Sequence, residues 1–265
     1  MRRVAAVILL LVVLTAALGP LLAPHGYNEE FRESLNAPPG GRFPMGTDDT
    51  GRDRFSRLLY GTGVSVLLAP TAAAVSIVLA LVFAVPGASR VPLVSAAVSG
   101  LTTICLSLPW IFLFIILRAK LPLNTQPAQS VLLTFGLMGV AGWAWPARVF
   151  TAAIRELRQS GWILQGYAAG LPLRRILLVH GWPHLRAIAS AQFRILVPAY
   201  ILSEASLGLL GLGVAEPLPS WGSLLKDLQH PAVVHDNPWV LAPLGLLILV
   251  MISLEALQSA PEGAI

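Results

Sequence analysis

The chain has 265 residues, of which 55% are hydrophobic and only 12% are charged. Its mean hydropathy is +0.73, and soluble domains carry about 25% charged residues, so the composition excludes an ordinary soluble protein and predicts an integral membrane protein. The formal net charge of +5 is typical of orientation signals and contacts with membrane lipid, and we expect no nucleic-acid partner.

Residues 1–24 are predicted to form the first transmembrane helix. Arg2 and Arg3 precede an uncharged run that reaches Pro24, and about 20 apolar residues cross a bilayer. The two arginines favour a cytoplasmic start. A cleaved signal peptide is the alternative interpretation of this run.

Residues 25–57 form a polar segment that should lie outside the membrane on the opposite side. Gly46 and Gly51 allow tight turns, and the intervening hydroxyl and carboxylate side chains can bond their own backbone. We expect a structural, non-catalytic ion network made by Asp48, Arg52, Asp53 and Arg57. The arginines that alternate with the aspartates argue against a metal site here.

Residues 58–256 carry five further apolar runs, so the sequence predicts an all-α protein with six transmembrane helices. The expected spans are residues 58–89, 91–117, a run that ends near 145, 193–213 and 238–254. A cytoplasmic loop of residues 154–192 separates the fourth and fifth spans. Both termini then lie in the cytoplasm, and residues 257–265 form a short cytoplasmic tail.

The stretch Leu164–His184 within that loop is predicted to be a helix, a glycine break and a second helix. Gly170 can adopt a left-handed conformation past the first helix, and Pro172 suits the first turn of the second. Gly181 and Pro183 are expected to end the second helix. Seven arginines surround the stretch, as expected on the cytoplasmic side: Arg148, Arg155, Arg158, Arg174, Arg175, Arg186 and Arg194. An exposed helical hairpin of this kind predicts a docking site for a soluble partner.

Glu204 is an ionisable residue inside the predicted fifth span. A charged group at that depth is costly, so we expect it to face a second subunit or a translocation path rather than lipid.

Three of these stretches together resemble permease subunits of ATP-binding-cassette importers, in the dipeptide, oligopeptide and nickel subfamily. The first matches the family pattern at its fixed positions, which are Gly46, Thr47, Asp48, Gly51, Arg52, Asp53, Ser56, Arg57, Leu58 and Gly61. The second runs from Glu204 to Gly213 and is followed by Ser220, Trp221 and Gly222. The third is the cytoplasmic loop, although Leu164 stands where the family has glutamate.

The resemblance implies a type I importer fold and a subunit that forms half of a translocation pathway for peptides or nickel in the cytoplasmic (inner) membrane. The implied partners are a second permease, two ATPase subunits and an external solute-binding protein. It also implies that the cytoplasmic loop couples to the ATPase through Gln165, Gly166, Tyr167, Ala168, Ala169, Gly170, Arg175, His180 and Pro183.

The residues themselves predict no catalytic centre, cofactor or metal. The two lysines, Lys120 and Lys226, do not follow a glycine-rich phosphate loop, so ATP hydrolysis is expected in separate subunits. Two other classes stay open as alternatives: an autonomous secondary transporter, which usually shows repeated halves and several intramembrane charges, and, less favoured, a membrane-embedded hydrolase.

Overall fold

A computed structural model describes residues 2–109, 112–113, 115–116, 126–172, 175, 179 and 181–258. Over these residues the regular secondary structure is helical, with one isolated bridge between Thr47 and Asp53. The chain divides into two compact units. Unit 1 comprises Met1–Pro70, Phe114–Phe135 and Pro198–Ile265, and unit 2 comprises Thr71–Leu113 and Gly136–Val197.

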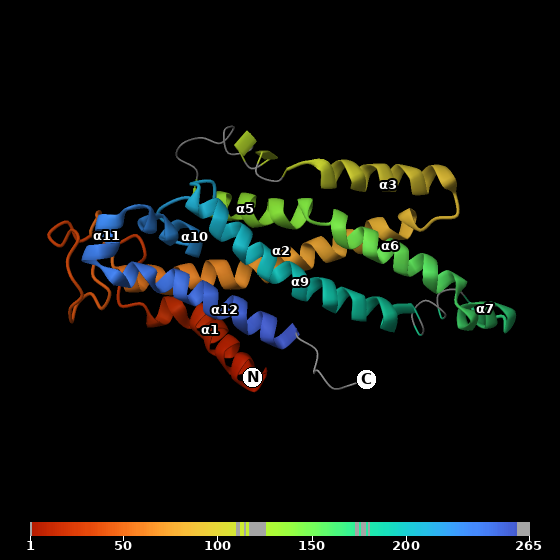
Figure 1. Ribbon diagram of the computed structural model, residues 1–265, viewed down its shortest axis with the longest axis horizontal. Helices are drawn as coiled ribbons and strands as arrows, with labels where there is room; N and C mark the ends of the chain where they lie inside the picture. Colours follow the sequence, from red (N-terminus) through yellow and green to blue (C-terminus); the bar gives the residue numbers. More distant parts are fainter. Residues whose placement is uncertain are drawn as a thin grey trace. The chain divides into compact units, whose positions relative to one another are not determined.

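Unit 1 is built on α1 (Arg2–Leu22), the first part of α2 (Arg54–Gly87) and α12 (Ala242–Gln258). Helix α1 packs along α12 and against α2 (Figure 1). A Cβ atom on Gly19 would lie 2.8 Å from the Leu59 carbonyl oxygen, and one on Gly63 would lie 2.9 Å from that of Ala16. Small residues therefore let the backbones of α1 and α2 approach closely, as is common between membrane helices.

The remaining elements of unit 1 are short. They are α10 (Trp221–Leu224), η2 (Leu225–Gln229), α11 (Pro231–Asp236) and η3 (Pro238–Leu241), together with the last part of α9 (Trp182–Leu209) and the first part of α5 (Pro127–Ala141). Residues 221–229 thus form two short helical segments in succession, α10 and η2.

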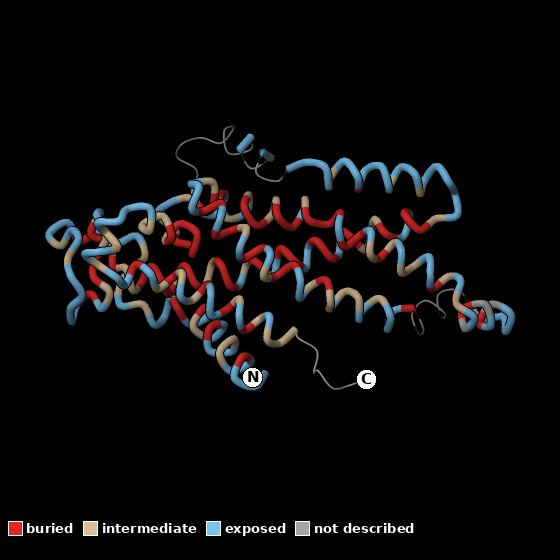
Figure 2. The backbone as a smooth tube through the Cα atoms, viewed as in Figure 1, coloured by how far each residue is buried: buried red, intermediate tan, exposed pale blue. Residues whose placement is uncertain are grey.

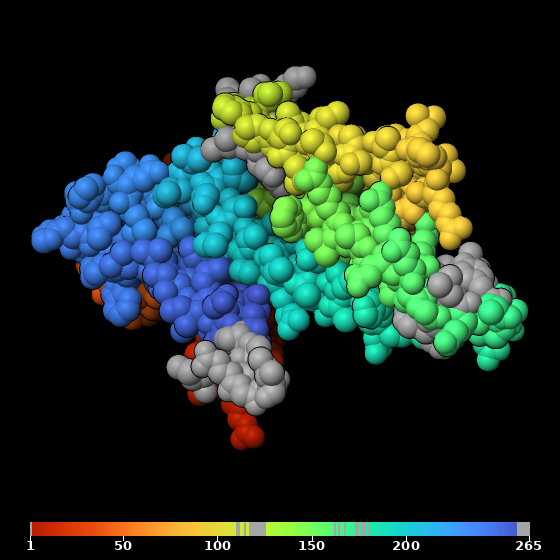
Figure 3. Space-filling view, turned by 45° about the vertical axis from the view of Figure 1, so that its right-hand side comes forward, coloured from red at the N-terminus to blue at the C-terminus, as the bar shows by residue number. Residues whose placement is uncertain are grey.

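Unit 2 contains α3 (Pro92–Ser107), α6 (Ala144–Gln159), α7 (Gly161–Ala168) and parts of α2, α5 and α9. Helix α3 lies beside α6 (Figures 1 and 3). Arg155 links the two, because its guanidinium donates to the Gly87 carbonyl oxygen at 2.8 Å and to Ser95 Oγ at 2.7 Å. Thr102 is the buried residue of α3, and the other residues of this helix are exposed or half-buried (Figure 2).

Five described helices are long and apolar enough to cross a membrane, judged by length and composition. They confirm the all-α membrane fold, whereas the count of six spans stays a prediction. The expected third span of residues 91–117 corresponds to a helix of 16 residues that ends at Ser107, followed by an extended Leu108 before Pro109. Proline disfavours a helical conformation in the residue before it.

The start of the fifth span was predicted too late in the sequence. Helix α9 starts at Trp182 instead of Phe193 and ends at Leu209, because the polar stretch that precedes the apolar run continues the same helix. Hydropathy locates the apolar part of a helix and not its polar beginning. The predicted loop of residues 154–192 therefore includes the end of α6, all of α7 and the first turns of α9.

Candidate functional site

The polar segment before α2 turns at two glycines, as predicted, and both glycines are left-handed. Gly46 and Gly51 have φ angles of 72° and 83°. Between them, Asp48 Oδ1 accepts hydrogen bonds from the Thr50 nitrogen at 2.9 Å and from the Arg52 nitrogen at 2.8 Å. The carboxylate thus satisfies two backbone donors of its own turn, the behaviour expected of aspartate in such a position.

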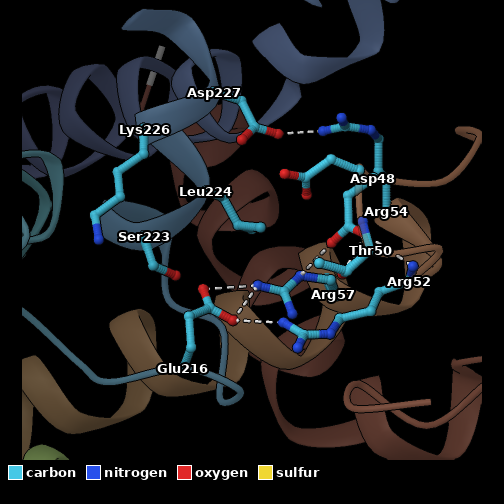
Figure 4. Close-up of a pocket in the computed structure, with 11 residues that line it drawn as sticks. Asp48, Thr50, Arg52, Arg54, Arg57, Glu216, Ser223, Leu224, Lys226 and Asp227 are labelled. Carbon is cyan, nitrogen blue, oxygen red and sulfur yellow. Dashed lines mark hydrogen bonds and ion pairs between the residues drawn. The ribbon is translucent and has the colours of Figure 1, made fainter. Parts of the chain in front are cut away.

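The arginines of this segment converge on a carboxylate that lies far away in the sequence (Figure 4). Arg52 donates to Glu216 at 2.9 Å, and Arg57 donates to both oxygens of Glu216 at 2.9 and 2.8 Å. Arg52 also bonds Glu30 at 3.0 Å, and Arg57 Nε lies 3.8 Å from Asp48 Oδ2. The predicted ion network therefore exists for Asp48, Arg52 and Arg57, but its centre is Glu216, which the sequence analysis missed.

Asp53 does not belong to that network, and the prediction that it pairs with the arginines is wrong. Its side chain is buried and accepts from Ser56 Oγ at 2.5 Å and from the Ser56 nitrogen at 3.2 Å. It also lies 3.2 Å from Nδ1 of His25. Asp53 precedes the first residue of α2, so it caps the free N–H groups of that helix. The Thr47 hydroxyl joins two parts of the polar segment, because it accepts from the Ala37 nitrogen at 2.8 Å.

Glu204 on α9 is completely buried within unit 1. Its Oε2 accepts from Ser65 Oγ of α2 at 2.7 Å, and Ser65 Oγ accepts in turn from the Trp221 nitrogen at 3.0 Å. The buried Trp221 indole donates to Thr62 Oγ1 at 3.0 Å. The carboxylate is thus away from lipid, as predicted, but it lies in the interior of its own unit instead of on a surface that a second subunit can reach.

A close backbone contact supports this buried cluster. A Cβ atom on Gly222 would lie 2.8 Å from Gly208 Cα and 2.6 Å from the Glu204 carbonyl oxygen. Ser220 and Ser223 form a reciprocal capping box around the first turn of α10. Helix α10 is thereby held directly against α9, and Gly208 permits this close approach.

The first half of the predicted docking stretch is the helix α7, which ends in a left-handed glycine cap. Gly170 has a φ angle of 71°. The Leu171 nitrogen donates to the Gly166 carbonyl oxygen at 3.0 Å, and the Ala169 nitrogen donates to that of Gln165 at 2.8 Å. These bonds satisfy carbonyl groups at the helix end, as in a Schellman motif, so the predicted conformation of Gly170 is confirmed.

The second half of the stretch is only partly described. The expected second helix largely falls outside the described residues, as do His180 and the side chain of Tyr167; Arg175 is helical and exposed. Pro183 was expected to end that helix, but it lies in the first turn of α9, where a proline nitrogen costs no hydrogen bond. A small apolar cluster holds α7 in unit 2: Leu157, Ile163, Leu171 and Leu185.

These sites define a class of protein: a helical membrane protein with charged turns, a buried carboxylate and an exposed helical loop. Among the described residues no group of three or more histidine, cysteine or acidic side chains is arranged to hold a metal ion. His230 and His235, near each other in the sequence, are therefore not part of such a group.

The chain belongs to the family described as binding-protein-dependent transport system inner membrane component, whose model matches residues 54–262. A second model, the N-terminal transmembrane domain of oligopeptide transport permease C, matches residues 1–39. The protein is accordingly a permease component of an ATP-binding-cassette importer and not an enzyme, and ATP hydrolysis lies in separate subunits.

Curated relatives align over almost the whole chain. The oligopeptide transport system permease protein OppC of Escherichia coli (strain K12) is 30% identical over 92% of this chain and 80% of its own length. The proteins DppC and OppC of Bacillus subtilis (strain 168), named as dipeptide and oligopeptide transport system permeases, are 25% and 26% identical. These alignments cover 97% and 100% of this chain, and 79% and 85% of the relatives.

Proposed function

We propose that this permease forms half of a translocation pathway for dipeptides or oligopeptides. The carrying observation is the match to the permease family over residues 54–262, together with relatives named for dipeptide and oligopeptide transport. The partners we propose are a second permease, two ATPase subunits and an external solute-binding protein. Nickel, the other solute considered from the sequence, has no support among these relatives.

The proposed location is the cytoplasmic membrane, with both termini in the cytoplasm. Residues 1–24 are the first span, residues 25–57 the external polar segment, residues 58–256 the permease core and residues 257–265 the cytoplasmic tail. The support is the distribution of basic residues, since Arg148, Arg155 and Arg158 on α6 and Arg186 and Arg194 on α9 flank the loop that we assign to the cytoplasm. Arginine and lysine favour that side of the membrane.

The loop around α7 is the proposed coupling element to the ATPase. Ala168 and Ala169 are small and exposed, so they allow a close approach, whereas Gly166 is buried in the chain. Tyr167 offers one large anchor, and Gly170 ends α7. A Cβ atom on Gly170 would meet nothing within 4 Å, so its surroundings within the described chain are open and accessible to a partner.

The test is uptake in cells that lack the corresponding importer. Expression of the permease with its genomic partner subunits should restore uptake of labelled di- and oligopeptides, and omission of the ATPase subunits should abolish it. Uptake of nickel without uptake of peptides would refute the proposed substrate. Uptake that persists without any ATPase would instead favour an autonomous secondary transporter.

A further inference from the structure

A charged cavity of about 240 Å³ lies in unit 1, beside the cluster centred on Glu216 (Figure 4). Its walls come from the polar segment at residues 48–57, from Glu216 and from residues 223–227 of α10 and η2. The lining includes the side chains of four basic and four acidic residues: Arg52, Arg54, Arg57 and Lys226, and Asp48, Asp49, Glu216 and Asp227.

Most of these charges are already paired. Arg52 and Arg57 bind Glu216, and Arg54 forms an ion pair with Asp227. The side chains of Lys226 and Asp49 are different, because neither has an ion pair or hydrogen bond to any residue that the structure describes. The edge of the cavity thus keeps one half-buried cation, Lys226, and one exposed anion, Asp49, without a partner among the described residues.

Arg52 adds a further uncommitted donor. Its Nε is buried and lacks a hydrogen-bond partner among the described residues. Buried polar groups are nearly always hydrogen-bonded, and an exception in a native structure is often explained by a bound ion, water or ligand. An oxygen-bearing ligand close to the arginines would supply the missing acceptor.

The charges limit the chemistry of such a ligand. A free metal cation would meet four basic side chains, and a phosphate would meet four carboxylates, so neither is favoured. An apolar molecule would strip water from charged groups without replacing their hydrogen bonds. A small zwitterion satisfies both uncommitted charges, with its carboxylate near Lys226 and its ammonium near Asp49. The volume is below the roughly 300–1,000 Å³ of pockets for drug-sized ligands, so the ligand is short.

We propose that this cavity is an outer subsite for the free ends of a short peptide on its way into the permease, an inference that rests on the proposed peptide transport. Lys226 would bind the peptide carboxylate and Asp49 the peptide amino group. The ion pairs of Arg52, Arg54 and Arg57 would stay intact, while an oxygen atom of the bound peptide would accept a hydrogen bond from the free Nε of Arg52.

The experiment compares uptake of one peptide in three forms: unmodified, amidated at its C-terminus and acetylated at its N-terminus. The complete importer is used, with its loaded binding protein, and the variants are Lys226→Gln and Asp49→Asn. Arg32→Gln and Asp236→Asn serve as matched controls, because both residues are exposed and lie outside the cavity lining. The binding protein is the same throughout, so a change in preference between peptide forms arises in the permease.

Lys226→Gln should lower the preference for the unmodified over the amidated peptide by about two- to fivefold, the range of a solvent-accessible ion pair. Asp49→Asn should do the same for the unmodified over the acetylated peptide. Preferences that equal the wild type in both variants would overturn the subsite, as would an equal loss for all three forms, which indicates docking of the binding protein. Absence of peptide uptake by the wild type would instead refute the proposed function itself.

Discussion

Glu216 connects the polar segment to the loop between α9 and α10, since it accepts hydrogen bonds from both Arg52 and Arg57. The Arg57 side chain is only 6% exposed, whereas that of Glu216 is 46% exposed. Loss of the carboxylate therefore leaves a largely buried guanidinium with fewer partners, which costs more than the loss of an exposed ion pair.

Glu216→Gln should consequently lower the free energy of unfolding by about 1–2 kcal/mol, because the amide keeps the shape but removes the charge. The measurement is thermal unfolding of the purified protein in detergent. Glu33→Gln is the control, since its carboxylate is 68% exposed and lies 3.9 Å from its nearest basic partner. Equal melting temperatures for the two variants would contradict the role given to Glu216.

A substitution of Trp221 tests the buried cluster around Glu204. Trp221→Phe removes the hydrogen bond to Thr62 and leaves unfilled volume at a fully buried site. We expect a loss of about 1–3 kcal/mol in stability. The comparison is Trp239→Phe, because Trp239 is 53% exposed. If both substitutions shifted the unfolding midpoint equally, the buried cluster around Glu204 would not contribute the stability that we assign to it.

Helix α10 depends on the direct contact between Gly208 and Gly222. Gly222→Ala places a methyl group 2.8 Å from Gly208 Cα, so backbone must move, and we expect a destabilisation of about 1–3 kcal/mol. Gly245→Ala on α12 is the matched control, since nothing lies within 4 Å of the added Cβ atom. That control should leave stability unchanged or raise it, because alanine favours helix. A stable Gly222→Ala protein would show that α10 is not held by this contact.

Helix α7 and Gly170 test the proposed coupling. Gly170→Ala costs about 1 kcal/mol of backbone strain at a left-handed φ angle, but the space around it is open. We expect Gly170→Ala to transport at a reduced rate, and Gly170→Asp to insert and fold while ATP hydrolysis stops responding to the loaded binding protein. Assays of membrane insertion and stimulated ATPase activity separate the two effects. Normal transport by Gly170→Asp would mean that this loop has no partner.

Local chemistry explains which features the sequence could predict. The turns at Gly46, Gly51 and Gly170 depend on residues next to them; all three glycines have positive φ angles, which was predicted for Gly170. Asp53 was misassigned because an aspartate beside arginines resembles an ion-pair partner, although it also occupies the N-cap position of α2. Glu216 was missed because it lies 159 residues from Arg57, and no pattern marks one acid in a polar loop as a distant partner.

At the scale of the whole molecule, hydropathy predicted the membrane class and the apolar helices but not their ends. Helix α9 begins in a polar stretch, and α3 ends before a proline, so neither boundary coincides with a change in hydropathy. The large apolar side chains that remain exposed on α1, such as Val4 at 63% and Leu21 at 83%, fit a lipid environment. In water such a surface would be unfavourable.

Import by the purified complex tests the central claim most directly. The permease should be reconstituted into vesicles with its second permease, both ATPase subunits and the binding protein, and accumulation of labelled dipeptide should be followed together with ATP hydrolysis. The account predicts accumulation only when ATP, the ATPase subunits and the binding protein are all present. Accumulation by vesicles that contain the permease alone, or ATP-driven accumulation of nickel but not of peptide, would contradict it.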